Sequence, residues 1–386
     1  MKKVDVRGSK NSKVRREHII SILSVNLNAI GKTILGEEDY SGHCENPIGA
    51  TQIPVGVAGP LRLEARSWKL EAGYIPLATT EGALVASVNR GCKVVTQSGG
   101  AIVEIDNVGI TRGPVFKVPS ITKGRQMEQW LMQNLDTLNA LAQETSTHIK
   151  LLNIFTRLVG RNLYMRFSFD TQDAMGMNMA TIATQKIVDY IENKTGHQCI
   201  ALAGNFDIDK KPAYLNSLLG RGYRVWAEVV VKKQTVVDQL HSTSEKMADV
   251  VYRKSLLGSA LSGSLGFNAH YANIIAAIYA ATGQDLAHVV EGSLGMTTAE
   301  VEDNGDLYFS VYLPAVVVGT VGGGTGLPTQ KEALSLLGVW GGNNGKNASK
   351  FAGIIGVTVL AGELSLTASI AEGSLAKTHE KFRKKL

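Results

Sequence analysis

Residues 101–206 carry a succession of short strand patterns and longer helix patterns, and this succession restricts the fold more than any other feature of the chain. Strand patterns occupy residues 102–105, 115–118, 162–167 and 199–202. Helix patterns occupy residues 124–142, after the second strand, and 179–193, after the third. Apolar side chains recur every second residue in a strand pattern and every third or fourth in a helix pattern. The segment therefore predicts a self-contained α+β unit inserted into a larger domain.

The sequence on either side of this insert predicts a larger domain of helices and strands. Helix patterns cover residues 15–35, 81–90, 236–251 and 349–370, and another helix pattern begins at residue 331. Strand patterns cover residues 53–63 and 224–232. The helix over 81–90 is expected to begin at a Thr N-cap and to stop at Gly91. Asn304-Gly305 lies between two alternating segments and predicts a hairpin turn. A length of 386 residues favours two packed units, although one large α/β domain is also allowed.

Composition excludes several classes of protein. The net charge of +6 is spread along the chain except at its basic tail, and aromatic residues are scarce, so we expect no nucleic-acid partner. The tail suits a solvated surface or contact with a phosphate-rich small molecule. Cys44, Cys92 and Cys199 match no zinc or redox spacing, which predicts no metal site, reduced thiols and a cytoplasmic protein. The N-terminus does not resemble a signal peptide, and the apolar run 351–362 is too short to cross a membrane, so no membrane association is expected.

Glu81, Lys210, Asp285 and His379 together supply an acid, an amine, a carboxylate and an imidazole, which are the groups needed to reduce an activated carbonyl. Each also has a plainer structural explanation. Glu81 would be stabilised at a helix N-terminus by the helix dipole, and Lys210 would belong to a cationic surface turn. Taken singly, none of these residues identifies a reaction.

Two further segments leave the same choice open. The glycine run 319–326 fits neither the Rossmann nor the Walker spacing, so a turn is as consistent with it as a ligand loop, and a phosphotransferase is disfavoured. The three methionines of residues 173–179 suit either core packing or a soft surface for a flat cofactor ring.

In this chain order, the motifs together closely resemble those of the 3-hydroxy-3-methylglutaryl-CoA (HMG-CoA) reductases. The matching segments are residues 45–49, 54–61, 79–82, 89–91, 111–114, 173–179, 209–212, 268–270, 283–285 and 319–325. Asp-Lys-Lys-Pro-Ala, Asn-Ala-His and Gly-Thr-Val-Gly-Gly-Gly-Thr are similar to class I, the biosynthetic class, rather than to the degradative class. The resemblance implies an α+β fold in which a large helix-and-sheet domain carries an inserted ferredoxin-like cofactor domain.

The same resemblance implies domain boundaries and an activity. It implies an N-terminal helical segment at residues 1–44 and a large substrate domain in two parts, 45–112 and 207–374. It also implies a small NADP-binding domain at residues 113–206 and a C-terminal flap at 375–386. Such enzymes reduce HMG-CoA to mevalonate and CoA by two hydride transfers from NADPH, in the mevalonate pathway of isoprenoid biosynthesis. The resemblance also implies a soluble catalytic domain without a membrane anchor, as a homodimer or dimer of dimers with shared active sites.

The roles of individual residues follow from the matched motifs. Lys210 would stabilise the developing oxyanion, Glu81 would be a general acid whose pKa is raised by burial and by Asp285, and His379 would protonate the CoA thiolate. The residues expected at the substrate are Arg112, Asp209, Lys211, Lys254, Asn273, His270, Asn89 and Arg90. The residues expected at the cofactor are Ser146, Asp173, Met175, Gly176, Met177, Asn178, Gly322, Gly323 and Gly324.

Two alternative functions stay open. One is an NAD-linked degradative HMG-CoA reductase, and the other is a non-catalytic protein that binds CoA or a nucleotide. The arginine expected beside Ser146 for a 2′-phosphate is missing, but Lys150, Arg383 and Lys384 could replace it, so NADPH is favoured over NADH.

Overall fold

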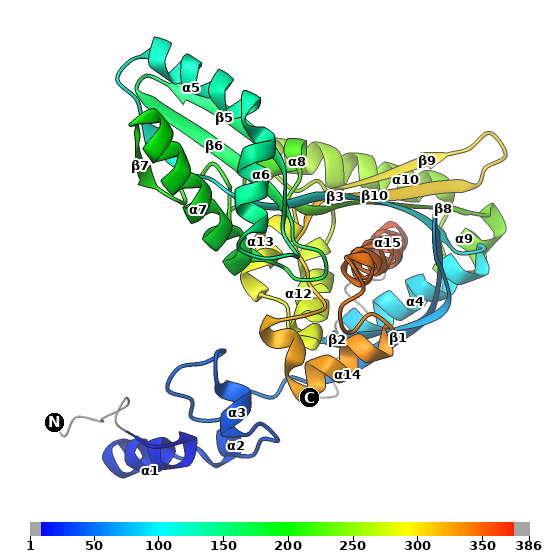
Figure 1. The fold of residues 1–386 in the computed structure, drawn as a ribbon. Coiled ribbons are helices and arrows are strands. Elements are labelled where there is room, and N and C mark those ends of the chain that lie inside the picture. The colour runs from blue at the N-terminus through cyan, green and yellow to red at the C-terminus, as the bar shows by residue number, and fades with distance from the viewer. Residues whose placement is uncertain (1–8, 374–386) are drawn as a thin grey trace.

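The described residues, 9–373 of this computed structural model, build a ten-stranded sheet that serves two hydrophobic cores (Figure 1). Its main path runs through β7 (Gln198–Ala201), β4 (Val115–Lys117), β6 (Asn162–Asp170), β3 (Ala101–Arg112), β8 (Gly222–Val231), β10 (Leu307–Val316) and β9 (Met296–Val301). Beside this path β5 (Lys150–Val159) pairs with β6, and β1 (Val55–Ala65) pairs with β2 (Lys69–Ala78) and β3.

Strand β3 joins the two halves of the sheet because its two ends pair with different strands. Residues 102–109 pair antiparallel with β8, and residues 110–112 pair antiparallel with β6. Gly109 stands where the partner changes, with a φ of +82°. A Cβ at this position would lie 2.8 Å from the carbonyl oxygen of Phe169, so both the backbone angle and the space favour glycine there.

The small half of the sheet has the topology of a ferredoxin-like unit. Chain order is β4, α5 (Ile121–Gln133), α6 (Leu135–Gln143), β5, β6, α7 (Met177–Thr195) and β7. The spatial order β7-β4-β6-β5 and the antiparallel pairing of all three neighbours complete a βαββαβ arrangement. The predicted fold class, with its ferredoxin-like insert, is therefore confirmed.

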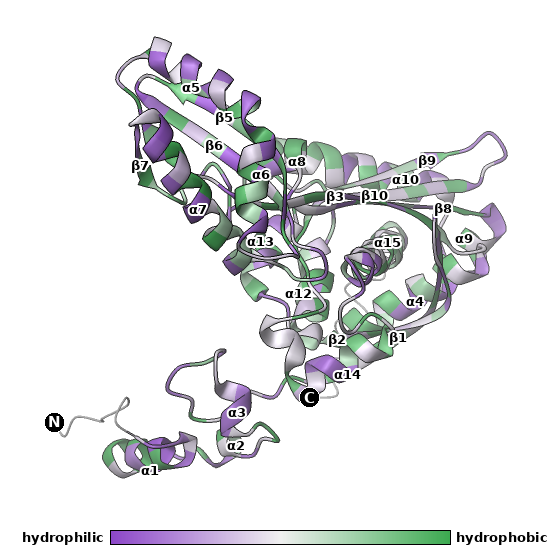
Figure 2. Ribbon diagram, in the orientation of Figure 1, coloured by the Kyte–Doolittle hydropathy of each residue, from purple (hydrophilic) through white to green (hydrophobic). Residues whose placement is uncertain are grey.

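Two details of the insert differ from the prediction. The strand patterns omit β5, whose alternation is interrupted by a register shift between Leu151 and Asn153. The single helix expected over residues 124–142 is two helices, because Asn134 leaves helical geometry between α5 and α6. In Figure 2 both green hydrophobic and purple hydrophilic residues are visible along α5, as expected of a helix with one covered face.

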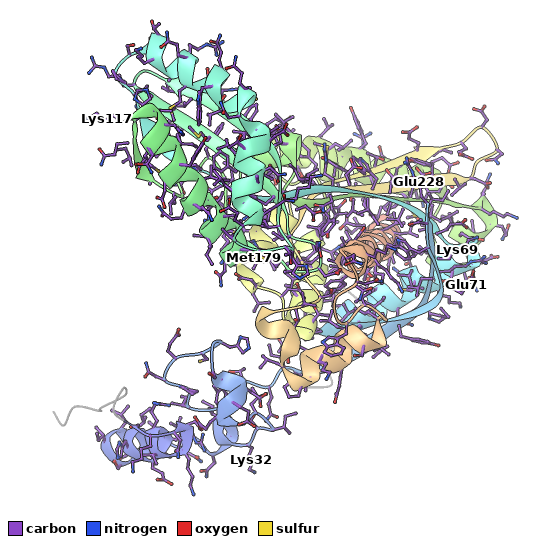
Figure 3. All side chains as sticks on the ribbon, viewed as in Figure 1. Lys32, Lys69, Glu71, Lys117, Met179 and Glu228 are labelled. Carbon is purple, nitrogen blue, oxygen red and sulfur yellow. The ribbon has the colours of Figure 1, made fainter. Side chains whose placement is uncertain are left out.

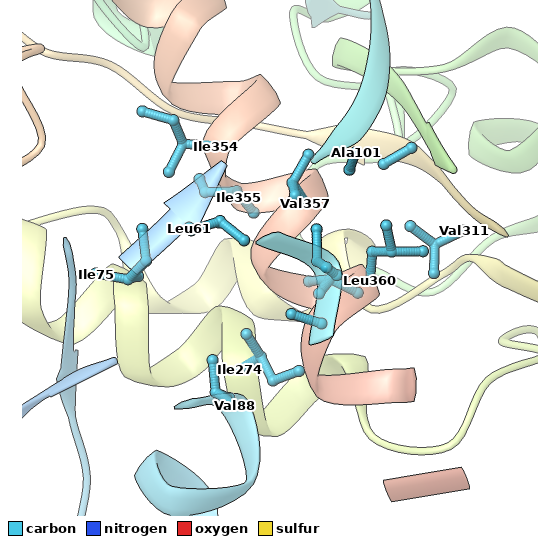
Figure 4. Close-up of a cluster of buried hydrophobic side chains, with 14 of the residues drawn as sticks. Leu61, Ile75, Val88, Ala101, Ile274, Val311, Ile354, Ile355, Val357 and Leu360 are labelled. Atoms are coloured by element: carbon cyan, nitrogen blue, oxygen red, sulfur yellow. The ribbon is translucent and has the colours of Figure 1, made fainter. Parts of the chain in front are cut away.

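A long buried helix, α15 (Lys346–Glu372), fills the core of the large half (Figure 4). Leu61, Ile274 and Val311, from three other elements, belong to the same cluster of buried apolar residues. Figure 1 shows α15 between the large sheet and α4 (Leu84–Gln97). The helix and β8 can approach this closely because residue 356 is a glycine: a Cβ there would lie 2.4 Å from a methyl group of Val225 on β8.

The helix predicted over residues 349–370 is confirmed, and it is not limited to the apolar run 351–362. The helix continues through Glu363, which is fully buried and hydrogen-bonded, for 27 residues in all. Within residues 9–373, α15 is the helix long and apolar enough to cross a membrane, and 78% of its most apolar window is buried inside the protein. Such burial is typical of a core helix.

The helix expected over residues 81–90 is displaced and longer. Helix α4 starts after Ala83, whose φ is +76°, so Glu81 precedes the helix instead of lying in its first turn. Gly91 does not end the helix either. A Cβ there would lie 1.8 Å from the Ala361 carbonyl oxygen, so this glycine lets α4 and α15 pack backbone against backbone.

The structure contains further helices along the described chain. They are α1 (Ser12–Leu23), α2 (Asn28–Gly31), α3 (Glu37–Tyr40), α8 (Tyr214–Leu219), α9 (Lys233–Leu240), α10 (Ser244–Val250), the π-helix η1 (Val251–Gly258), α11 (Ser259–Ser262), α12 (Tyr271–Thr282), η2 (Leu286–His288), α13 (Val289–Gly292), η3 (Gly323–Gly326) and α14 (Pro328–Leu336). The helices expected over 15–35 and 236–251 are each divided, the latter at His241, whose φ is +54°. The predicted hairpin at Asn304-Gly305 is confirmed by the antiparallel pair β9 and β10.

Candidate active site

An open cleft of about 780 Å³ brings together residues from α12, η1 and the loop before α8. Lys254, His270 and Asn273, all predicted at the substrate, line it together with Pro212, which directly follows Lys211. Lys254 lies on the π-helix, an unusual geometry that often occurs at functional positions. The structure thus places three predicted substrate residues around one cavity.

Lys210 and Asp285 form an ion pair next to this cleft. Lys210 Nζ lies 2.6 Å from Asp285 Oδ2, and each side chain is about one-third exposed, at 38% and 33%. Burial alone would raise the pKa of Asp285, but the hydrogen bonds from Lys210 and from the Ala287 N–H, with the nearby charge of His288, lower it overall. Asp285 is therefore an ionised partner for the lysine.

Glu81 reaches the same region through Asn273. The Asn273 side-chain amide donates to Glu81 Oε2 at 2.6 Å, although the two residues are 192 positions apart in the chain. The Glu81 backbone N–H is held by the Thr79 hydroxyl at 2.9 Å, so the Thr79-Thr80 motif forms a turn before α4 and not an N-cap. Glu81 thus contacts Asn273, whereas Asp285 contacts Lys210. The expectation that Glu81 is buried is wrong, because its side chain is exposed in the turn before α4.

His270 is oriented by a carboxylate of the core helix. Glu363 accepts hydrogen bonds from the backbone N–H groups of Ala269 and His270, from the Thr297 hydroxyl and, at 2.8 Å, from His270 Nδ1. Burial alone would raise the pKa of Glu363, but these hydrogen bonds and the His270 charge lower it. Glu363 therefore fixes the orientation of the His270 imidazole at the edge of the cleft.

Asn89 and Arg90, neighbours on α4, are held by different elements: Asn89 by β1 and Arg90 by α15. Arg90 donates to the Ser365 hydroxyl at 3.0 Å and to the Ser369 hydroxyl at 2.6 Å. The Asn89 side-chain oxygen accepts from the Gly59 N–H at 3.0 Å. Both predicted CoA contacts therefore have structural partners on the protein.

Arg112, the last residue of β3, lies beside Asp209 and Lys211 of the loop between β7 and α8. Arg112 Nη1 lies 3.3 Å from Asp207 and 4.0 Å from Asp209, and its other nitrogens donate to the Thr181 hydroxyl. Lys211 Nζ donates to the Asp209 carbonyl oxygen at 3.1 Å. This predicted carboxylate-binding group is thus assembled from β3, α7 and the loop.

The buried Arg166 holds the loop between β7 and α8 in place by hydrogen bonds to its backbone. It is 2% exposed and donates to the carbonyl oxygens of Phe206 and Asp207 and to the Asn216 side chain. Burial lowers its pKa to about 10, so the guanidinium remains charged at neutral pH. The loop needs such support because Lys210 itself has a φ of +55°.

Three buried residues behind Lys210 are missed by the sequence analysis. Arg221, His288 and Glu291 are each 0% exposed, and Arg221 Nη1 and His288 Nδ1 both contact Glu291 Oε1. The spacing Asp285-x-x-His288-x-x-Glu291, with acid and imidazole one helical turn apart, is the signal that could have found two of them. Nothing in the local sequence marks Arg221.

The same group includes a possible set of metal ligands. Asp209, His288 and Glu291 each offer a ligand atom within 4.8 Å of the others. However, Arg221 Nη2 lies 3.0 Å from Asp209 Oδ1, and Arg221 Nη1 pairs with Glu291. The guanidinium already supplies the positive charge that these carboxylates need.

The predicted cofactor residues lie together on a different face of the site. Val321 pairs with Ala174, and a Cβ at Gly319 would meet the Met175 nitrogen at 2.4 Å, so the glycine run lies directly against residues 173–176. Gly322 and Gly323 have positive φ and open space around them. Gly176 precedes the first turn of α7, where Asn178 is exposed. Met179, labelled in Figure 3, lies on this first turn.

Two of the predicted cofactor residues, Asp173 and Met177, already have hydrogen-bond partners within the protein. Asp173 accepts hydrogen bonds from the backbone N–H groups of Asn343, Gly345 and Ala348, and therefore caps the start of α15. Met177 is 8% exposed, and its sulfur accepts from Arg221 Nη2 at 2.9 Å. Asp173 and Met177 therefore support the face from within the protein. Asn178, Gly322 and Gly323 are exposed on it, whereas a Cβ at Gly176 would meet Thr171 at 2.4 Å.

Two predicted site residues, Ser146 and His379, do not lie among the residues described above. Ser146 lies in the turn before β5, where its hydroxyl accepts from the His148 N–H at 3.1 Å. His148 Nδ1 lies 2.9 Å from the Gln172 side-chain oxygen, which links that turn to the loop before Asp173. His379 lies outside the described residues.

Comparison with known proteins identifies the family. The family model described as hydroxymethylglutaryl-coenzyme A reductase matches residues 11–384. The reductase of Aeropyrum pernix is 50% identical over 372 residues, covering 95% of this chain and 88% of the relative, and that of Methanocaldococcus jannaschii is 49% identical over 378 residues, covering 96% and 92%.

A solved structure shares the fold at much lower identity. The class II 3-hydroxy-3-methylglutaryl-CoA reductase from Streptococcus pneumoniae, bound to NADPH in open conformations, has a TM-score of 0.69 and 17% identity, covering 96% of this chain and 100% of the other. The fold, the grouping of the motif residues and the sequence identity agree, and the chain belongs to the hydroxymethylglutaryl-coenzyme A reductase family.

Proposed function

We propose that this chain reduces HMG-CoA to mevalonate and free CoA, consuming two molecules of NADPH. The observation that carries the proposal is the Lys210–Asp285 ion pair beside a cleft that also holds Asn273, the partner of Glu81. An amine, an ionised carboxylate and a second acid at the edge of one cavity suit a carbonyl that becomes negatively charged as it is reduced.

Each reduction places charge on an oxygen that Lys210 can stabilise. The thioester carbonyl becomes a hemithioacetal, its C–S bond breaks to give an aldehyde and the CoA thiolate, and the aldehyde is reduced to the alcohol. Asp285 orients Lys210 through the 2.6 Å contact between its Oδ2 and Lys210 Nζ. Glu81 is proposed as the general acid that donates a proton to the alkoxide. His379 is proposed to protonate the thiolate, which prevents its return to the aldehyde.

The substrate carboxylate is proposed to bind the cations around the loop before α8. Arg112, Lys211 and Lys254 supply positive charge, and Asp209 accepts a hydrogen bond from the substrate hydroxyl. His270, Asn89 and Arg90 are proposed to contact the CoA portion. Their fixed partners on α15 and at Gly59 would hold them in position before the substrate arrives.

The open face of the glycine run fits a nicotinamide. A Cβ added at Gly322 or Gly323 would meet no heavy atom of residues 9–373 within 4 Å. Val321, which precedes them, pairs with Ala174, a few residues before the exposed Asn178. Ser146, Met175 and Gly324 complete the proposed contacts with the cofactor. Asp173 and Met177 are proposed to hold the backbone of this face in place. Bound NADPH supplies the hydride for both reductions. The streptococcal relative is described as bound to NADPH, which supports NADPH over NADH.

The biosynthetic class and the domain division are part of the proposal. Identities of 44–50% to archaeal and rice reductases, against 17% to the class II structure, support class I. The separate cores support a small NADP-binding domain at residues 113–206 inserted in a large domain at 45–112 and 207–374, with residues 1–44 and 375–386 as an N-terminal segment and a flap.

A homodimer in the cytoplasm is proposed for the assembled enzyme. In Figure 1 helices α1 to α3 extend away from the two cores. The chain next to them exposes Ile34 at 73%, Val55 at 58% and Val57 at 51%, around a cavity of about 880 Å³. Exposed apolar side chains of this kind are typical of a surface that a second copy covers.

A spectrophotometric assay tests the activity. Purified protein is mixed with HMG-CoA and either NADPH or NADH, and oxidation of the nicotinamide is followed together with release of free thiol. We expect turnover with NADPH at a ratio of two nucleotides per thiol, and its loss in Glu81→Gln, Lys210→Ala and Asp285→Asn. No turnover with either nucleotide would contradict the proposal, and retained turnover in the variants would contradict the residue roles.

A further inference from the structure

A single buried oxygen atom holds the backbone of Lys210. Glu291 Oε1 accepts a hydrogen bond from the Lys210 N–H at an N···O distance of 3.4 Å. The same oxygen is contacted by Arg221 Nη1 and, at 2.9 Å, by His288 Nδ1. Glu291 is 0% exposed, so these contacts are not weakened by solvent.

His288 extends this contact to the other member of the ion pair. Its Nε2 lies 3.9 Å from Asp285 Oδ2, the oxygen that lies 2.6 Å from Lys210 Nζ. The imidazole is fully buried, and its Nε2 has no hydrogen-bond partner within residues 9–373. With Nδ1 held by Glu291, the ring can turn little, so Nε2 stays directed at Asp285.

The conformation of Lys210 explains why such support is needed. Lys210 and the nearby Ile208 have φ values of +55° and +53°, which residues with a side chain rarely adopt. A strained backbone persists only where surrounding contacts hold it. Arg166 holds the carbonyl oxygens before Lys210, and Glu291 holds its N–H.

We infer that Glu291 and His288 are positioning residues of the reductase site. Glu291 fixes the Lys210 backbone, and His288 orients the Asp285 carboxylate, so that the amine and its counter-ion keep one geometry through both reductions. Arg221 neutralises Glu291 and joins this pair to Asp209 through a 3.0 Å contact. The inference rests on the proposed function, because its main readout is the rate of that reaction.

The test compares two variants that differ in what they leave intact. Glu291→Gln removes the charge that binds Lys210 N–H and Arg221. His288→Asn places an amide near the former Nδ1, which preserves a donor to Glu291 and removes the nitrogen that faces Asp285. We expect kcat to fall by about 10- to 100-fold in both, with KM for HMG-CoA changed less than about threefold, because small misplacements affect the transition state most. Even if Glu291→Gln fails to fold, His288→Asn leaves the Glu291–Arg221 pair in place.

A double-variant comparison separates positioning from a general loss of structure. Since His288 acts through Asp285, we expect His288→Asn to have little further effect on kcat in an Asp285→Asn background. The control is Glu228→Gln, which removes a carboxylate that accepts from the Tyr308 hydroxyl on the large sheet, away from the site (Figure 3). We expect that variant to keep wild-type kcat.

The possible outcomes distinguish the two claims. Active wild-type protein with equally active, folded His288→Asn and Glu291→Gln variants would overturn this inference alone. The same holds if the effects of His288→Asn and Asp285→Asn simply multiply. Inactive wild-type protein with both nucleotides would overturn the proposed function and, with it, the inference.

Discussion

Replacing Glu363 by glutamine tests how the core helix supports the substrate site. The carboxylate is fully buried on α15, and its two oxygens accept four hydrogen bonds: from His270 N and Nδ1 on Oε1, and from Ala269 N and Thr297 Oγ1 on Oε2. Glutamine has nearly the same shape but only one accepting oxygen. Its NH₂ group must therefore face two of the four donors.

The size of the effect follows from which donors can adapt. If the NH₂ group faces Thr297, that hydroxyl can turn and accept, but the Ala269 N–H is left unpaired. If it faces His270, the ring can carry its proton on Nε2, but the His270 backbone N–H is left unpaired. Either way one buried N–H costs about 1–3 kcal/mol, and weaker neutral hydrogen bonds replace charge-assisted ones, so we expect a loss of about 3 kcal/mol.

The pH dependence gives a second signature. The folded pKa of Glu363 lies below its ordinary value of 4.5, because its hydrogen bonds to His270, Thr297 and Ala269 outweigh the effect of burial. A carboxyl with a lowered folded pKa stabilises the protein fully above the unfolded pKa and loses this contribution as pH falls through the folded pKa. The difference in stability between wild type and Glu363→Gln should thus be constant near neutral pH and shrink below about pH 4.5.

Thermal unfolding and steady-state kinetics measure both consequences. We expect the midpoint to fall by about 3–5 °C at pH 7, because a loss of about 3 kcal/mol is spread over the large unfolding entropy of a chain of this length. We also expect KM for HMG-CoA to rise, since His270 loses its orientation. The matched control is Glu332→Gln, an exposed carboxylate on α14, which should unfold like wild type. A Glu363→Gln midpoint within about 1 °C of wild type at pH 7 would refute the reasoning, because it would show that the four contacts contribute little.

Three further changes have defined outcomes. Gly91→Ala should cost about 3 kcal/mol in thermal or urea unfolding, because the new methyl would lie 1.8 Å from the Ala361 carbonyl oxygen, whereas Gly342→Ala, with its nearest atom at 3.8 Å, should cost much less. Arg112→Lys should raise KM for HMG-CoA about tenfold with kcat changed less, because an ammonium cannot contact Asp207 and the Thr181 hydroxyl together. Ile34→Glu should shift the protein toward monomer in light scattering, since this 73% exposed side chain lies on the proposed dimer surface, and an unchanged mass would contradict that placement.

Much of the fold can be predicted because local patterns and global fold agree in this chain. Alternation predicts the insert, and Asn304-Gly305 predicts the hairpin. Predictions fail where a tertiary contact overrides a local signal. Gly91 resembles a helix stop but serves close packing, and Glu363 resembles the end of an apolar run but is a buried acceptor of four hydrogen bonds.

The site divides in the same way. Lys210, Asp285 and Glu81 can be found because their motifs resemble those of a known family, and the structure brings Lys210 and Asp285 into contact. The residues behind them carry no such signal. Arg221 contacts Glu291, 70 positions later in the chain, and only the folded backbone makes them neighbours. Support of this kind depends on distance in space, which sequence spacing does not reveal.

Helix α15 connects the two ends of the proposed site. Asp173 binds the N–H of Ala348 at the start of the helix, next to the glycine run, while Glu363 and Ser365 hold His270 and Arg90 farther along. Ala348 and Glu363 are fifteen residues apart, which is about 22 Å at a helical rise of about 1.5 Å per residue. A buried helix changes length very little, so the distance between the proposed cofactor face and the proposed CoA contacts is set by one core element. Motion during catalysis should therefore come from segments outside this helix, and the buried middle of α15, from Phe351 to Ser365, should hold some of the last amides to exchange with solvent.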